Sequence, residues 1–107
     1  MGTATTPEKK TKEKTDVQKQ PPYNVILHDD DDHTFEYVII MLKDLFGHSL
    51  EIGFQMAEEV HKTGRVIVCT TSMERAELKR DQIHGYGPDP RLERSQGSMS
   101  ASIEPAE

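Results

Sequence analysis

The large apolar side chains of this sequence cluster between Tyr23 and Leu78, and the residues on either side of that segment are mostly polar. Only 34% of the 107 residues are hydrophobic and 30% are charged, so the chain has too few apolar groups for two separate cores. The sequence therefore predicts one small domain whose core comes from the middle of the chain.

The two ends of the sequence are predicted to lie outside that domain. Residues 1–22 hold almost no large apolar side chain, so burial cannot offset the entropy lost on ordering, and a disordered arm is predicted there. The folded domain is predicted over residues 23–86. Residues 87–107 are predicted to be a tail, in which three alternating apolar residues favour a weak edge strand at 98–104 beside the first strand. These three are Met99, Ala101 and Ile103.

Hydrophobic periodicity predicts two strands and three helices inside the domain. Short β-branched runs indicate strands over residues 24–28 and 65–70. Apolar residues at helical spacing, bounded by capping residues and glycines, indicate helices between Thr34 and Gly47, between Ser49 and Gly64, and between Thr71 and about Gly85. The order predicts an α+β fold, with a small antiparallel sheet of two to three strands covered by three helices.

Two details of the helices are also predicted. Thr71 and Glu74 have the T-x-x-E form of a capping box, which would begin the third helix. The second helix has four residues at helical spacing that are predicted to line one apolar stripe, flanked by Ile52, Met56 and Val60. The four are Leu50, Phe54, Ala57 and His61.

Charge and composition limit the classes of partner. The formal net charge is −6 and the pI is near 5.3, which argues against a surface that binds nucleic acid. No apolar run approaches the roughly 20 residues of a membrane span, and no secretory signal is visible. Cys69 is the single cysteine and lies in an apolar run, which favours an inert buried thiol in a reducing compartment. We therefore expect a cytoplasmic protein.

The most unusual stretch of the sequence is the run of four aspartates from Asp29 to Asp32. Adjacent carboxylates repel one another unless a cation or solvent compensates their charge. A solvated acidic loop, a divalent metal site and a site for an ammonium group all remain open. A metal is the weakest of the three, because the run lacks the spaced oxygen ligands, glycine and terminal glutamate of a calcium loop.

His61 lies on the predicted stripe, where a core histidine and a functional histidine are both possible. If the acidic loop folds over the end of the helix hairpin, neutral His61 could accept a hydrogen bond from an amine whose charge Asp30 balances. An apolar hole would lie beside this pair. Its walls would be Phe35, Val38, Ala57 and Val60. That combination fits a free α-amino group attached to a large apolar side chain.

Sequence motifs for catalysis are missing. There is no nucleophile elbow, no glycine loop that cradles phosphate, and no cysteine or histidine spacing suited to zinc. We therefore expect a protein that is not an enzyme and that needs no cofactor or metal.

Three stretches of the sequence together resemble one known family. Residues 23–31 followed by 34–38 are similar to the opening strand, acidic loop and first helix of the ClpS family of Clp protease adaptors. Val60-His61 followed by Gly64-Arg65 is similar to the end of its second helix, and Thr71, Glu74, Ala76, Glu77 and Lys79 are similar to the start of its third. The resemblance covers about residues 22–86, with a weaker match near the last strand.

This resemblance implies an adaptor that holds the N-terminal Leu, Phe, Tyr or Trp of a substrate protein and docks on the N-terminal domain of a Clp-type AAA+ unfoldase. By position, the α-amino group would be held by Asp29, Asp30 and His61. The side-chain pocket would be lined by Phe35, Val38, Ala57, Val60 and Met99. Asp31 would support the loop, and the unfoldase would contact Glu74, Glu77 and Lys79. The last three are equally consistent with a helix cap and ordinary surface charges.

The sequence departs from the family pattern at three positions. The usual Asn at the first loop position is Asp29, which can accept hydrogen bonds but cannot donate them. Phe35 replaces a Met whose flexibility adapts to different guests, so we expect a narrower range of accepted residues. The family's Thr-Pro pair reads His33-Thr34.

Two other function classes compete with the adaptor. One is a general interaction domain that binds a folded partner without recognising N-terminal residues, since the fold also resembles the C-terminal domain of the ribosomal stalk protein. That domain carries a basic helix face, whereas the loop here is acidic. The other is a binding protein regulated by a metal ion.

Overall fold

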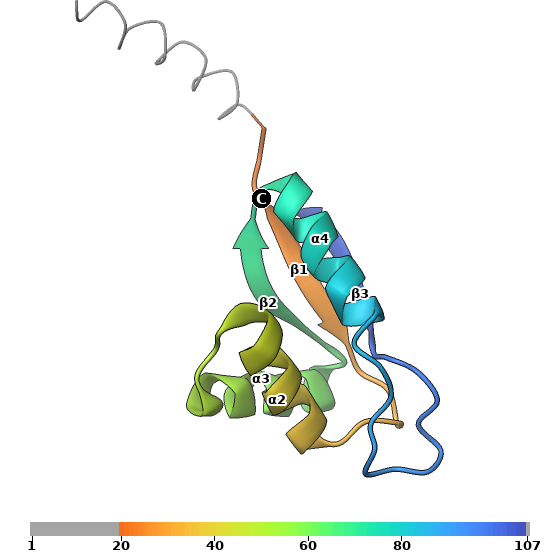
Figure 1. The fold of residues 1–107 in the computed structure, drawn as a ribbon. Helices are drawn as coiled ribbons and strands as arrows, with labels where there is room; N and C mark the ends of the chain where they lie inside the picture. The colour runs from red at the N-terminus through yellow and green to blue at the C-terminus, as the bar shows by residue number, and fades with distance from the viewer. Residues whose placement is uncertain (1–19, 107) are drawn as a thin grey trace, which may run out of the picture.

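The computed structural model describes residues 20–106, so most of the predicted arm lies outside the described residues. The chain forms six elements, which Figure 1 shows as a small sheet with three helices. In order they are β1 (Tyr23–His28), α2 (Phe35–Phe46), α3 (Leu50–Thr63), β2 (Arg65–Thr71), α4 (Met73–His84) and β3 (Ser100–Pro105). The predicted α+β class is confirmed.

The sheet has three antiparallel strands in the order β2-β1-β3. Val25 and Leu27 of β1 belong to the core beneath the helices, whereas Ile26 between them points to the opposite face, as strand alternation requires. The pairing of β1 with β2 shifts its register between Val25 and Ile26. The third strand, which the sequence predicted only weakly, pairs with β1 as expected.

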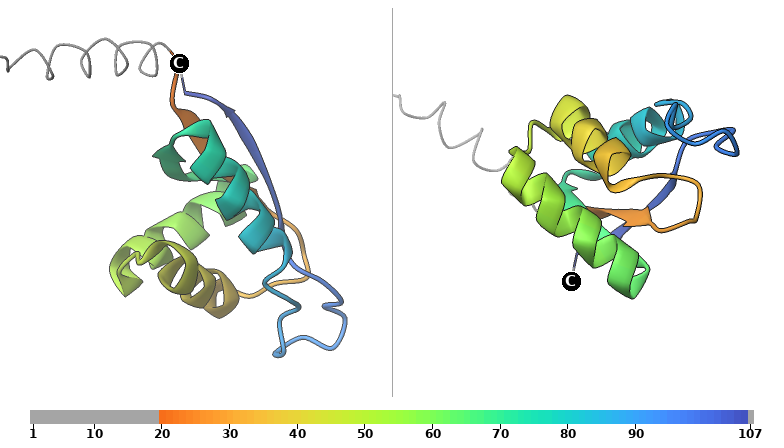
Figure 2. Two further views of the ribbon diagram at one scale, coloured as in Figure 1. Left: turned by 45° about the horizontal axis from the view of Figure 1, so that its top comes forward. Right: turned by 90° about the horizontal axis from the view of Figure 1, so that it is seen from below.

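The helices pack on this sheet in two groups. Helix α4 runs alongside β1 and β3, while α2 and α3 form a hairpin that contacts the sheet through β2 (Figures 1 and 2). The predicted caps Thr34 and Ser49 each accept a hydrogen bond from the backbone three residues later. Gly47 and Gly64 end the two helices with φ of 74° and 93°, a region that glycine enters without steric cost.

The predicted capping box of the third helix is wrong. Thr71 remains in β2, where it pairs with Tyr23, so the strand continues one residue further than its β-branched run indicated. Ser72 is the N-cap of α4, and its hydroxyl accepts a hydrogen bond from the backbone N–H of Arg75 at 3.3 Å. Glu74 lies in the first turn, where its negative charge favours the helix dipole.

Of the four residues in the predicted stripe of α3, only Ala57 is buried. The buried residues are Gly53, Ala57 and Val60, whereas Leu50 is 62% exposed, Phe54 is 48% exposed and His61 is exposed. The reason is the close approach of α3 to α2 at Gly53. A Cβ atom there would lie 3.4 Å from the Cα atom of Ile39. The bare glycine backbone therefore faces α2 and turns Phe54 toward the surface.

The segment after α4 returns to the domain. Met99 and Ala101 belong to the core cluster, and Asp89 and Ser95 are also buried. The core therefore includes residues beyond the predicted 23–86 boundary. Figure 2 shows the loop between α4 and β3 extending beside the loop that joins β1 to α2.

Among the helices of residues 20–106, none is long and apolar enough to cross a membrane.

Candidate functional site

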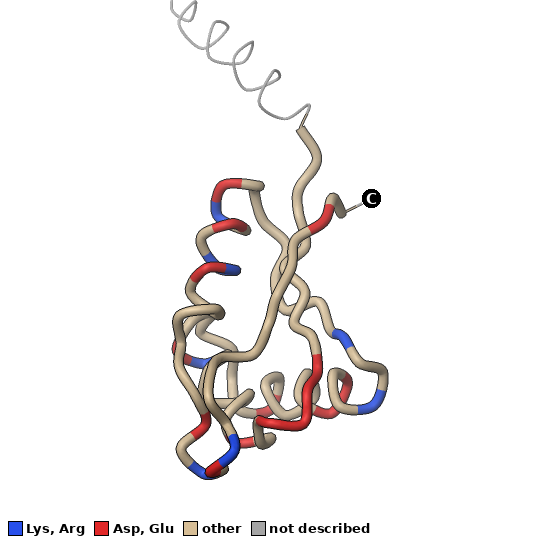
Figure 3. The backbone as a smooth tube through the Cα atoms, turned by 90° about the vertical axis from the view of Figure 1, so that its right-hand side faces the viewer, with Lys and Arg blue, Asp and Glu red and all other residues tan. Residues whose placement is uncertain are grey.

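The acidic loop connects β1 to α2 and begins at the end of α3. The backbone N–H of Asp29 donates to the carbonyl oxygen of Gly64 at 3.0 Å, and Gly64 caps the helix that carries His61. The four aspartates appear as a continuous red stretch of the tube in Figure 3. This bond places the start of the acidic loop next to the end of the helix that carries His61.

His61 contacts the first residue of α2. Its ring centroid lies 5.5 Å from that of Phe35, with the two planes at 72°. On the other side Phe35 meets Phe54 at 5.9 Å, again edge to face. These are favourable geometries for aromatic pairs, so the Phe35 ring is held between two side chains of α3.

The five residues predicted to line the side-chain pocket are adjacent to the core but differ in exposure. Val38, Ala57, Val60 and Met99 are all buried, each at 4% exposure or less. Phe35 alone is partly exposed and packs against the core cluster. Of the five, only Phe35 therefore offers ring surface to solvent.

Asp30 organises the loop through one carboxylate oxygen. Its Oδ1 accepts from the backbone N–H of Asp32 at 2.9 Å and lies 2.8 Å from Nδ1 of His33. Its other oxygen makes no hydrogen bond to the part of the chain that the structure describes, so it is free to accept from an external cation. Asp30 can thus hold the loop and bind an ammonium group at the same time.

The loop between α4 and β3 supplies the positive charge that the four aspartates require. Arg94 donates to the carbonyl oxygen of Asp31 at 2.6 Å and to Oδ1 of Asp32 at 3.2 Å. His33 reaches across to the carbonyl oxygen of Gly97 at 2.7 Å. Asp31, which was predicted to support the loop, is exposed and participates through its backbone. No sequence motif marks Arg94, because it lies in a Pro- and Ser-rich stretch.

Asp89 is a buried residue that connects the loop between α4 and β3 to the loop between β1 and α2. It is 1% exposed, and its Oδ2 accepts from the backbone N–H and the hydroxyl of Thr34 at 2.7 and 2.8 Å. Burial alone would raise the pKa of Asp89, but hydrogen bonds from Arg91 and Thr34 outweigh it and lower the pKa to about 2. The proline that the family usually has at this position offers neither an N–H group nor a hydroxyl. In this chain Thr34 supplies both donors, and their bonds to Asp89 hold the loop.

The three predicted docking residues of α4 are placed differently from one another. Glu74 and Glu77 are exposed on the helix surface. Lys79 is partly buried; its ammonium donates to the carbonyl oxygen of Leu45 and lies 5.4 Å from the ring centroid of Phe46. Lys79 therefore ties α4 to the C-terminal turn of α2.

Replacing Lys79 with alanine is expected to lower the free energy of unfolding by about 1 to 2 kcal/mol, because a charged hydrogen bond and a cation–π contact are lost. For a domain of this size, the midpoint of thermal unfolding would fall by roughly 5 to 10 °C. Lys62→Ala is the matched control, since the Lys62 side chain is 71% exposed. A Tm for Lys79→Ala equal to that of the control would contradict the structural role.

Metal binding receives no support from the part of the chain that is described. Within residues 20–106, no three His, Cys, Asp or Glu side chains are grouped so that they could hold a metal ion. Two of the four aspartate side chains bond instead within the protein, Asp32 to Arg94 and Asp30 to His33.

Comparison with known proteins identifies the family. The family profile described as "ATP-dependent Clp protease adaptor protein ClpS" matches residues 18–89, well over half of the chain. The chain belongs to the ClpS family.

Curated members of the ClpS family agree with this assignment. The ClpS adaptor of Vibrio atlanticus is 36% identical over 78 residues, which cover 73% of this chain and 74% of that protein. The adaptor of Ruegeria sp. is 37% identical over 76 residues, covering 71% and 67%. The chain is thus a member of a family of Clp protease adaptors, and the predicted resemblance is confirmed.

A solved ClpS structure shares the fold. It is ClpS2 of Agrobacterium tumefaciens bound to L-phenylalaninamide, with a TM-score of 0.69 and 24% sequence identity. The match covers 80% of this chain and 98% of that one. The ClpS profile ends at Asp89, so Arg91, which pairs with Asp89, and Arg94, which bonds to the acidic loop, lie beyond it.

Proposed function

We propose that this protein is an N-degron adaptor of the cytoplasm. It binds the free α-amino group and the bulky apolar first residue of a substrate protein, and it delivers that substrate to a Clp-type AAA+ unfoldase. The observation that carries the proposal is the convergence of the acidic loop, His61 and Phe35 at one end of the helix hairpin. The protein acts by binding alone and catalyses no reaction.

The amino group would be held by three side chains. Asp29 and Asp30 supply negative charge, and Asp30 keeps one oxygen free for the ammonium. His61 is exposed, so its neutral ring can accept a hydrogen bond from the amine without a change in the fold. Each charge-assisted hydrogen bond contributes about 1.5 to 3 kcal/mol.

The first side chain would enter beside Phe35. The Phe35 ring contacts Phe54 and His61 and packs against the core cluster that contains Val38, Ala57, Val60 and Met99. Burial of a Leu or Phe side chain supplies about 1.5 to 3 kcal/mol. The phenylalaninamide bound to the related ClpS2 has the same chemistry, a free amino group next to an aromatic side chain, and it supports this assignment.

Docking on the N-terminal domain of the unfoldase would use the exposed face of α4. Glu74 and Glu77 present negative charge there. Lys79 contributes to the same surface mainly by holding α4 against the hairpin. Since the acidic loop lies at the other end of α2, cargo and unfoldase could bind together (Figure 1).

Delivery is tested with a reporter protein that begins with Phe, incubated with a Clp unfoldase and its peptidase. We expect the chain to accelerate degradation of this reporter and to leave an otherwise identical reporter beginning with Ala unchanged. Glu77→Lys should slow delivery while peptide binding stays intact. The delivery role would be refuted if the Phe reporter were degraded at the same rate with and without the chain.

A further inference from the structure

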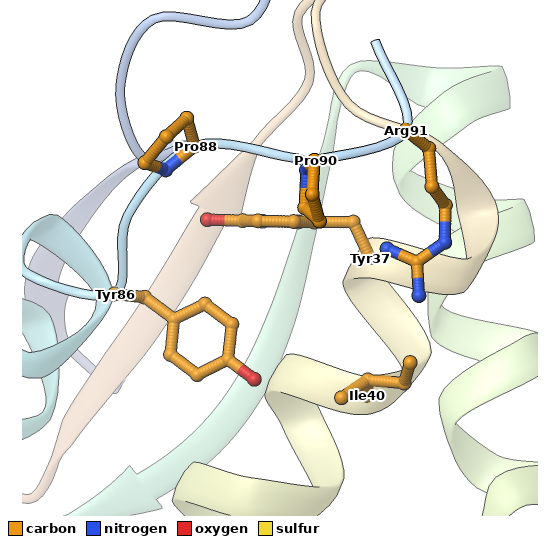
Figure 4. A pocket seen from close by; sticks show the side chains of 6 residues that line it. All are labelled: Tyr37, Ile40, Tyr86, Pro88, Pro90 and Arg91. Carbon is orange, nitrogen blue, oxygen red and sulfur yellow. The ribbon is translucent and has the colours of Figure 1, made fainter.

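A concave site lies between α2 and the loop that follows α4. It has a volume of about 180 Å³ and is shown in Figure 4. Its lining is mostly apolar and consists of Tyr37, Ile40, Tyr86, Pro88, Pro90 and Arg91. None of these residues belongs to the proposed cargo site or to the docking face.

The two sites occupy different sides of α2. Phe35 points to α3, where it meets Phe54 and His61. Tyr37 points instead to the loop after α4, where its ring lies 5.5 Å from that of Tyr86. The second site can therefore be filled without displacing Phe35.

The polar groups around this pocket are already hydrogen-bonded within the protein. The hydroxyl of Tyr37 donates to the carbonyl oxygen of Gly87, and that of Tyr86 donates to Asp44 at 2.6 Å. Arg91 is bonded to Glu36 at 2.9 Å and to Asp89 at 3.2 Å. The side chains of Tyr37, Tyr86 and Arg91 therefore face the pocket mainly with their apolar parts, and a proline, which has no N–H group, brings no donor that would need a partner there.

The walls include two tyrosine rings and two proline rings. The Tyr37 and Tyr86 rings stand at 84° to each other, and Pro88 and Pro90 form the opposite rim (Figure 4). Aromatic-lined grooves of this kind accept proline rings in an extended polyproline II segment, which loses little entropy on binding.

The charge around the pocket is negative. Glu36 and Asp89 pair with Arg91, and Asp44 accepts a hydrogen bond from Tyr86, so three carboxylates lie at or next to the lining residues. The chain as a whole carries −6. A basic residue beside the bound segment would gain favourable electrostatic energy at this rim.

We infer that the pocket between α2 and the loop after α4 binds an extended, proline-containing segment of a partner protein that carries a flanking Lys or Arg. The proline ring occupies the corner between Tyr37 and Tyr86, and the basic residue lies toward Asp44 and Glu36. This site is independent of N-terminal recognition.

The test uses the full chain and a peptide of sequence Arg-Ala-Pro-Pro-Leu-Pro-Arg, acetylated at its N-terminus and labelled at its C-terminus. Acetylation removes the amine that the cargo site would bind. We expect saturable binding by fluorescence anisotropy, about tenfold weaker binding when the prolines are replaced by alanine, and no competition from an unlabelled peptide with a free N-terminal Phe.

Paired variants locate the site. Tyr86→Ala should weaken binding about tenfold, whereas Tyr86→Phe keeps the ring and should bind like the parent. Ile40→Arg should block the pocket, and Leu78→Arg is its control, because the two residues are 40% and 49% exposed on helices. Equal binding by all four variants, equal binding when the prolines become leucine, or dimers of the chain that Ile40→Arg breaks would each overturn the inference.

Discussion

Replacing Asp89 with alanine is expected to lower the free energy of unfolding by about 3 to 5 kcal/mol, the range found when one partner of a buried charged network is removed. The carboxylate is 1% exposed and accepts hydrogen bonds from Thr34 and Arg91. The variant leaves the N-cap backbone of α2 without its acceptor and Arg91 without one of its two carboxylate partners. Urea unfolding at neutral pH measures the change.

Asp81→Ala is the matched control for this variant. The Asp81 side chain is 66% exposed and pairs only with its neighbour Arg80, so its removal should change stability by about 0.5 kcal/mol or less. If Asp89→Ala lowered the free energy of unfolding no more than Asp81→Ala does, the contacts of Asp89 with Thr34 and Arg91 would not stabilise the domain.

The lowered pKa of Asp89 predicts that the free energy of unfolding depends on pH. The pKa of Asp89 is about 2 in the folded protein against an ordinary value of 3.8, so the unfolded chain takes up a proton first as the pH falls. The stabilisation is complete above about pH 4 and is lost as the pH falls toward 2, a change of about 2 to 3 kcal/mol. Asp89→Asn should flatten this part of the stability curve, and an unchanged curve would contradict the assignment.

Asp30→Asn and His61→Ala are each expected to weaken binding of a peptide with a free N-terminal Phe by about tenfold to 100-fold, the equivalent of one charge-assisted hydrogen bond. His61 is exposed, so the domain should remain folded. Asparagine at position 30 can still accept from the backbone N–H of Asp32, which keeps the turn while it removes the charge. Anisotropy with the labelled peptide gives the affinities.

Lys62→Ala provides the control for His61, because Lys62 is the next residue on α3 and is largely exposed. Its affinity should equal that of the parent chain. Thermal unfolding separates a lost contact from a lost fold. Wild-type affinity for His61→Ala would remove His61 from the amine site, and unfolding of both Asp30→Asn and His61→Ala would mean that these residues serve the fold instead.

Much of the fold could be predicted from local patterns. The caps Thr34 and Ser49 and the terminating glycines act within one turn of chain, so they can be recognised from sequence. The errors arose where a tertiary contact decided the outcome. Gly53 packs against Ile39 and thereby exposes Phe54. Pairing with Tyr23 likewise keeps Thr71 in the strand.

Some residues of the candidate site could likewise be proposed from the sequence, whereas others could not. Asp30 and His61 were recognisable because of an unusual acidic run and a family resemblance. Asp89 and Arg94 were not recognisable, because they act across more than 50 residues of sequence, from a segment whose composition is typical of a tail. Long-range polar contacts of this kind leave no periodic signal along the chain.

The most direct test of the proposed function compares two peptides that differ only at the N-terminus. One begins with a free Phe and the other carries an acetyl group on the same residue, and fluorescence anisotropy measures the binding of each to the full chain. We expect the free peptide to bind and the acetylated peptide to lose its binding, because acetylation removes the charge that Asp29 and Asp30 would balance. Equal affinity for both peptides, or binding of neither, would contradict recognition of the α-amino group.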